Sequence, residues 1–375
     1  MSYISKIVAV VLFIFFTLPA GQIYAQEIIQ DKVEILKAKV VEIINQEKKE
    51  VPGTDVQSVY QTIQAEILDG NKKGEIINIE NDFLVLKKGD RFFLRHTIDG
   101  LDKRETYSVR DIDRQNVIIG FILLFVIVVI LFSGKQGLRS LISLVGSFFV
   151  ILYVLVPSLL NGYPPIITSI IIATIILFIA IFLTHGFNRE SLVAFSGTVL
   201  AVIITGVLAY IGVELARLTG FVSDEAVYLN FNTNGLLDFT GLLLGGIMIG
   251  VLGVLDDIAI TQAAIVSELY NSTHKLTKKE IYSKAIRIGK EHVGALVNTL
   301  ALAYTGASLP LLLLFSTSDS SIGSIINQEI FATEIIRTTV GSIGLILTVP
   351  ITTIIAIYLL KDYKSKDHKH NHIHS

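Results

Sequence analysis

Two adjacent aspartates interrupt an otherwise apolar stretch of the sequence. Residues 241–267 are apolar over a length that can cross a bilayer, yet they include Asp256 and Asp257. An ionised carboxylate faces lipid only at a cost of about 2.5 kcal/mol or more at the centre of a membrane helix. We therefore expect this pair to face protein or water, where a carboxylate can bind a cation or carry a proton.

Glycines are spaced so that they share a helix face with the second aspartate. Gly246, Gly250, Gly253, Asp257 and Thr261 follow one another at intervals of four, three, four and four residues, which is one stripe of a helix. Small residues in such a stripe allow a neighbouring membrane helix to approach closely. The spacing therefore predicts that Asp257 lies where two helices meet.

A second apolar segment, residues 293–315, carries a stripe of small and polar residues that suits the first. Its members are Gly294, Asn298, Ala301, Thr305 and Ser308, and Tyr304 lies beside them. Asn298 and Thr305 could hydrogen-bond Asp257 or a bound ion. The alternative is that the small residues only pack and that Asn298 links two helices. The predicted solute or ion pathway comprises Asp257, Asp256, Gly250, Gly253, Thr261, Asn298, Tyr304 and Thr305.

The composition is that of a membrane protein and excludes several kinds of chemistry. Of the 375 residues, 51% are hydrophobic and 17% are charged, and the mean hydropathy is +0.63. The absence of cysteine excludes disulfides, thiolate metal sites and cysteine nucleophiles. Because no nucleotide-binding loop or catalytic triad is present, we expect neither an enzyme nor a cofactor.

Composition changes along the chain divide it into four parts. Residues 1–25 have a lysine, a short apolar run and a small residue before Gln26, which is typical of a signal peptide or of an uncleaved anchor helix. Residues 26–115 are polar and contain short runs of period two, which predict an all-β domain, with an OB-like barrel as one form. Residues 116–361 hold the apolar segments, and residues 362–375 form a tail with alternating histidines.

Seven apolar segments predict a polytopic α-helical membrane domain. They are residues 117–132, 140–160, 165–183, 192–213, 241–267, 293–315 and 338–360. Lysine and arginine concentrate in the connections that would lie on the same side as the C-terminus. This bias predicts that the β domain is outside the cell membrane and that the C-terminus is cytoplasmic. A capping-box pattern, Thr277 with Glu280, predicts the start of an amphipathic helix that continues into the sixth segment.

Two sequence stretches resemble a known family. GVLGVLDDIAITQAAIVSEL at residues 250–269 and IGKEHVGALVNTLALAYTGASLPLLLL at residues 288–314 are similar to the YibE/F family of bacterial multi-pass membrane proteins. That resemblance implies the membrane topology and does not identify a substrate. The family pattern has one aspartate after the glycines, and Asp257 matches it best. Asp256 departs from the pattern, so the resemblance leaves open which carboxylate matters.

Three functions could use residues of these types. The first is a permease that moves a small solute or cation past the aspartates. The alternative is a membrane scaffold or sensor whose exported β domain binds a partner. An aspartyl protease is disfavoured because two carboxylates that share a proton must face each other, and these are adjacent on one helix. The expected partners are the bilayer, a small solute or cation and a second subunit, but not nucleic acid. Metal binding by the tail histidines, His368 to His374, is a separate alternative, whereas the predicted pathway contains no metal ligands.

Overall fold

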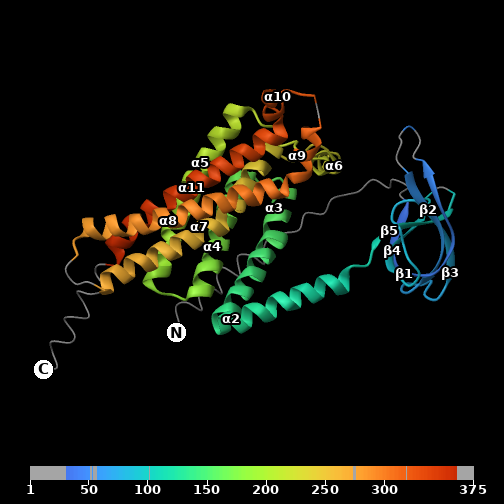
Figure 1. The fold of residues 1–375 in the computed structure, drawn as a ribbon, viewed down its shortest axis with the longest axis horizontal. Helices are drawn as coiled ribbons and strands as arrows, with labels where there is room; N and C mark the ends of the chain where they lie inside the picture. Colours follow the sequence, from blue (N-terminus) through green and yellow to red (C-terminus); the bar gives the residue numbers. More distant parts are fainter. Residues whose placement is uncertain are drawn as a thin grey trace. The chain divides into compact units, whose positions relative to one another are not determined.

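The chain divides into an N-terminal β unit, residues 1–123, and a C-terminal helical unit, residues 124–375. Figure 1 shows the elements of both units in a computed structural model. The structure describes residues 31–50, 53, 57–100, 102–272, 276–317 and 319–360. The predicted signal peptide and the histidine-rich tail lie outside the described residues.

Five antiparallel strands form the β unit. They are β1 (Lys32–Glu50), β2 (Gln57–Ile67), β3 (Ile76–Asn81), β4 (Arg91–Ile98) and β5 (Glu105–Ile112), in the sheet order β3-β2-β1-β4-β5. The long strand β1 pairs with β2 along one part and with β4 along another, and register shifts bend it in the β2 pairing. That bend curls the sheet until β3 and β5 come close to each other. The result is a partly open five-stranded half-barrel, which agrees with the predicted all-β domain.

The alternating apolar side chains that predicted the strands also fill the interior of the half-barrel. Ile63, Ala65 and Ile67 on β2 are fully buried, and they pack with Phe92 and Leu94 on β4. Alternate side chains of a strand point to opposite faces, so one face of each strand supplies the core while the other faces solvent.

The helical unit consists of long apolar helices with short connecting helices. In chain order they are α2 (Gln115–Val150), the π-helical turn η1 (Ile151–Leu155), α3 (Val156–Leu160), α4 (Pro165–His185), α5 (Arg189–Ala216), α6 (Asp224–Asn232), α7 (Phe239–Ser272), α8 (Lys278–Ala307), α9 (Leu309–Ser316), α10 (Ile322–Ile326) and α11 (Glu329–Leu359). Among the described residues, five candidate spans are long and apolar enough to cross a membrane, or six if the bent pair α8 and α9 counts as one. The predicted seven spans are therefore not confirmed as separate helices.

The difference arises mainly at the start of the helical unit. The first two predicted spans fall in one candidate, Gln115–Leu160, of 46 residues. Gly134 interrupts it with φ 55° and ψ −131°, a left-handed conformation that glycine adopts without a steric penalty. The sixth predicted span includes a bend of 64° between α8 and α9. Thr277 and Glu280 form the predicted capping box, and α8 runs without interruption from there into the apolar segment.

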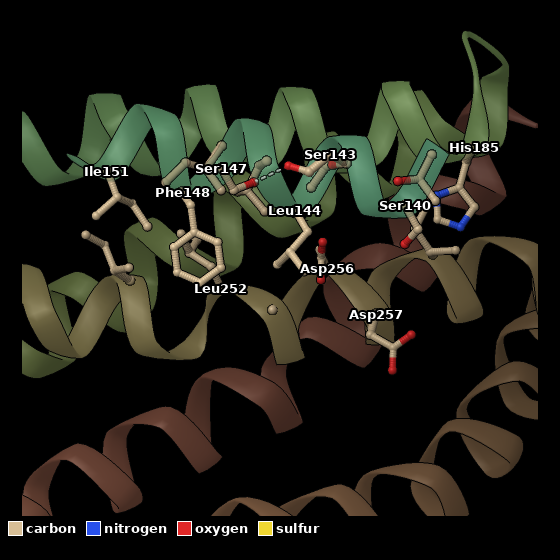
Figure 2. A pocket seen from close by; sticks show the side chains of 17 residues that line it. Ser140, Ser143, Leu144, Ser147, Phe148, Ile151, His185, Leu252, Asp256 and Asp257 are labelled. Atoms are coloured by element: carbon tan, nitrogen blue, oxygen red, sulfur yellow. Dashed lines mark hydrogen bonds between the residues drawn. The ribbon is translucent and has the colours of Figure 1, made fainter. Parts of the chain in front are cut away.

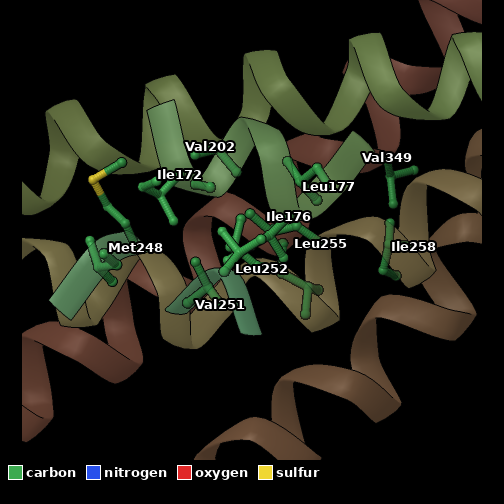
Figure 3. Close-up of a cluster of buried hydrophobic side chains, with 14 residues drawn as sticks. Ile172, Ile176, Leu177, Val202, Met248, Val251, Leu252, Leu255, Ile258 and Val349 are labelled. Carbon is green, nitrogen blue, oxygen red and sulfur yellow. The ribbon is translucent and has the colours of Figure 1, made fainter. Parts of the chain in front are cut away.

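α7 occupies the centre of the helical unit. Its buried side chains Val251, Leu252 and Leu255 pack among residues of α4, α5 and α11 in the cluster that Figure 3 shows. Glycines on α7 also allow α4 to approach, because a Cβ at Gly241 would lie against Pro165 and one at Gly245 against Ser169. The residue numbers of these two contacts rise together, so α4 and α7 run parallel.

α5 and α11 are antiparallel and meet at two glycine–threonine contacts, with one glycine on each helix. Gly197 of α5 lies against Thr352 of α11, and Gly344 of α11 lies against Thr205 of α5. α7 and α8 are also antiparallel, since Gly250 faces Tyr304 and Gln262 bonds to Ala285. These directions agree with the alternation that successive membrane crossings require.

Candidate functional site

A cavity of about 480 Å³ lies between α2, α4 and α7, and both aspartates line it. Figure 2 shows α2 and η1 on one side of the cavity and α7 on the other. The polar lining residues are Ser140, Ser143 and Ser147 of α2, Thr184 and His185 of α4, and Asp256 and Asp257 of α7. The remaining lining is mostly aliphatic. The site is therefore a mostly apolar cavity into which a few polar side chains, including both aspartates, are placed.

The two carboxylates point in different directions from α7. Asp256 is half-buried and is directed toward α2 near Leu144, whereas Asp257 is exposed and turns away from α2 (Figure 2). Successive helical residues are about 100° apart, so two adjacent side chains cannot face the same neighbour. Neither carboxylate forms an ion pair with a described residue. Asp256 is thus the more enclosed of the two.

The glycine stripe does not receive a neighbouring helix as the spacing predicted. Gly246 and Gly253 are exposed, and a Cβ at either position would meet no atom within 4 Å. Only Gly250 has a neighbour, the hydroxyl of Tyr304, at 3.2 Å from its built Cβ position. The close helix approach occurs instead at Gly245, one residue away, because the face of α7 that contains Leu244 and Met248 is the one buried against other helices.

The predicted polar stripe of residues 293–315 is separate from the cavity. Asn298 and Thr305 of α8 are exposed, and Thr261 of α7 is half-buried. None of the three lines the cavity. The structure therefore brings Gly253 together with both aspartates, and Gly250 together with Tyr304, but it does not bring Asn298 and Thr305 to the carboxylates.

A row of serines on α2 supplies the side of the cavity that sequence reasoning missed. Ser140, Ser143 and Ser147 are three and four residues apart, which places them on one helix face. Ser147 Oγ donates a hydrogen bond to the Ser143 carbonyl oxygen at 3.0 Å. The π-helical turn η1 follows directly, and such turns are frequent at functional sites. Serines at helical spacing within an apolar run were the signal for this face.

Gln262 fixes the position of α7 relative to two other helices. Its side chain is 2% exposed, and its amide nitrogen donates to the Ala285 carbonyl of α8 at 3.0 Å and to Thr353 Oγ1 of α11 at 2.7 Å. A buried amide is stabilised when such partners replace water. This residue lies less than two turns beyond Asp257, so it determines which way that part of α7 faces.

The chemistry available in the cavity is that of oxygen ligands. Carboxylate and hydroxyl oxygens suit protons and hard cations rather than soft metals. In the described part of the chain, no group of three or more His, Cys, Asp or Glu residues could hold a metal ion. The carboxylate and hydroxyl oxygens that line the cavity are thus groups that can bind a proton or a hard cation.

Comparison with known proteins places the helical unit in a family. The family model described as YibE/F-like protein matches residues 121–362, which includes every residue that lines the cavity. No curated protein and no solved structure matches the chain.

Proposed function

The chain belongs to the YibE/F-like protein family, and from this premise we propose that it is a multi-pass permease of the bacterial cell membrane that moves a small solute or cation. The cavity of α2, α4 and α7 would be part of the pathway. The observation that carries the proposal is that both aspartates of the apolar helix α7 line one cavity together with serine side chains of α2.

Seven crossings follow if Gly134 separates two spans. The candidate Gln115–Leu160 has 46 residues, which is about 69 Å of helix at about 1.5 Å per residue, whereas the hydrocarbon core is about 30 Å thick. A break at Gly134 gives two segments of suitable length. Counting α8 and α9 as one bent span then gives seven crossings. The lysine and arginine bias would place the β unit outside and the C-terminus in the cytoplasm.

If α7 crosses the membrane, the free-energy cost of its two carboxylates must be offset by a function or by polar surroundings. A charge at the centre of a membrane helix costs about 2.5 kcal/mol or more, and such residues usually mark ion or substrate pathways. Asp256 faces the serine row of α2, so a cation there would meet both carboxylate and hydroxyl oxygens. Asp257 lines the same cavity from the exposed side of α7, where the glycines leave room for a hydrated ion.

The proposal is tested by cation flux into proteoliposomes that contain the full-length protein. Encapsulated indicators report protons, Na⁺, K⁺, Mg²⁺ and Ca²⁺ in parallel. Asp256→Asn and Asp257→Asn remove one carboxylate each, and Glu268→Gln is the matched control because Glu268 is an exposed carboxylate of α7 outside the cavity. We expect flux of at least one cation, a decrease of about tenfold or more in one Asn variant, and no change in the control. Equal flux in all four proteins would exclude the aspartates from the pathway.

A second function, partner binding by the β unit, is favoured by an exposed aromatic loop. Phe83 and Val85, between β3 and β4, are 66% and 52% exposed. The buried side chain of Asn81 holds this loop through hydrogen bonds with Leu84 and with Gln61. A rigid loop that presents apolar side chains is suited to binding another protein.

Cross-linking in cells distinguishes this second function from transport. A photoreactive amino acid at position 83 is compared with the same group at position 88, which lies in the same connection. A discrete adduct from position 83 only, together with no cation flux, favours partner binding. Equal labelling from both positions would argue against a specific surface at Phe83.

A further inference from the structure

A second hollow, of about 450 Å³, adjoins the cavity that contains the aspartates. It lies where α2, the end of α4 and the first turn of α5 come together. Thr184, His185 and Ile260 line both spaces, so the two are neighbours. The other residues of the second hollow differ in kind from those around the aspartates, because two cationic and two amide side chains line it beside a single carboxylate, Glu190.

A buried hydroxyl at this place has no partner. Ser191 lines the hollow, is 1% exposed, and its Oγ forms no hydrogen bond within the described part of the chain. Its backbone N–H is satisfied, because it donates to Oδ1 of the capping residue Asn188 at 2.7 Å. An unpaired buried polar group costs about 1–3 kcal/mol. A polar ligand in the hollow would remove that cost.

The charges around the hollow favour an anion. Lys135 and Arg139 of α2 line it, and neither forms an ion pair with a described residue. The N-terminus of α5 adds the partial positive charge of a 28-residue helix. Glu190 is the single carboxylate of the lining and opposes this excess. Two cationic side chains and a helix N-terminus thus act on one small space.

We propose that this hollow binds a phosphate-type oxyanion, carried either by a lipid headgroup or by free phosphate. The Arg139 guanidinium can bind two phosphate oxygens at once, and Lys135 supplies a second positive charge. The first turn of α5 is a ready anion site, and the Ser191 hydroxyl donates the hydrogen bond that it otherwise lacks. α4 ends here and α5 begins here, which is the level of lipid headgroups if both cross the membrane. The site does not require that the protein transports anything.

Binding is measured on the full-length protein in a maltoside detergent, which contains no phosphate. Isothermal titration with sodium phosphate, against sodium chloride at the same ionic strength, tests the free anion. Native mass spectrometry after addition of phosphatidylglycerol tests the lipid headgroup. The variants are Ser191→Ala, which removes only the buried hydroxyl, and Lys135→Gln with Arg139→Gln. The matched control is Lys284→Gln with Arg287→Gln, which removes two exposed charges from α8.

We expect the α2 double variant to weaken binding about tenfold or more, Ser191→Ala to weaken it several-fold, and the α8 control to leave it unchanged. Binding of both probes identifies free phosphate as a ligand, and binding of the lipid alone identifies a headgroup. No binding of either probe, or equal binding by all variants, would overturn the proposal. Asp256→Asn and Asp257→Asn should keep this binding even if flux fails, so the two proposals are separable.

Discussion

Substitution of Gly344 by alanine tests the contact between α5 and α11. Gly344 lies against Thr205, which is fully buried. A Cβ at position 344 would lie 3.2 Å from both Cβ and Cγ2 of Thr205, and closer still to its hydroxyl. The hydroxyl donates to the Ala201 carbonyl at 2.8 Å, which favours one rotamer. The added methyl group therefore has no space unless the two helices separate.

The expected destabilisation is the difference between two effects. Overpacking in a well-packed interior costs about 1–3 kcal/mol. Replacing a helical glycine by alanine contributes about 0.5–1 kcal/mol in the opposite direction, because alanine loses less backbone entropy. The middle of each range leaves a net loss of about 1 kcal/mol in the free energy of unfolding, or a factor of about 5 in the folding equilibrium.

The assay is unfolding of the full-length protein by detergent titration, followed by circular dichroism. Gly246→Ala is the matched control, because a Cβ there would meet no atom within 4 Å. We expect the control to be unchanged or stabilised by up to about 1 kcal/mol. Thr205→Ala combined with Gly344→Ala should recover part of the loss, since it removes the hydroxyl and Cγ2. Equal stability of Gly344→Ala and Gly246→Ala would refute the packing argument.

Three further predictions concern other parts of the chain. Gln262→Leu removes two interhelical hydrogen bonds and should lower the stability of the helical unit by about 1–2 kcal/mol in the same unfolding assay. In the β unit, Glu105 accepts hydrogen bonds from Lys72, Tyr107 and His96, which lowers its pKa from 4.5 to about 2. The contribution of Glu105 to stability is therefore complete above pH 4.5 and lost as the pH falls toward 2. Hydrogen-exchange protection of β5 should decrease over that interval. Glu105→Gln should weaken this dependence without abolishing it, because Asp111 and Asp113 also have lowered pKa values. Thr277→Ala breaks the capping box and should destabilise the first turn of α8 by about 1 kcal/mol, measured as faster amide exchange there and not in α11.

The elements that the sequence predicted are those whose formation depends on residues close together in the chain. The capping box at Thr277 pairs residues three positions apart, so it can be recognised without knowledge of the rest of the chain. The alternation in residues 61–67 reflects the two faces of a strand, and the structure places a strand there. The long apolar runs likewise predicted helices, since burial of an apolar run requires satisfied backbone hydrogen bonds. The predicted spans 117–132 and 140–160 already left a break around Gly134, but the positive φ of this glycine, within one long helical run, was not predicted.

The sequence by itself determined that an acid-bearing apolar helix exists and that it must face something polar. Only the tertiary structure decided which residues that helix meets. A helix turns about 100° per residue, so a small rotation of α7 changes its neighbour from α8 to α2 and exchanges the roles of Asp256 and Asp257. That rotation is set by contacts distant in sequence, such as Gln262 with Thr353 and Gly245 with Ser169. The serine row of α2 became part of the site for the same reason, because packing between distant segments brought it to the carboxylates.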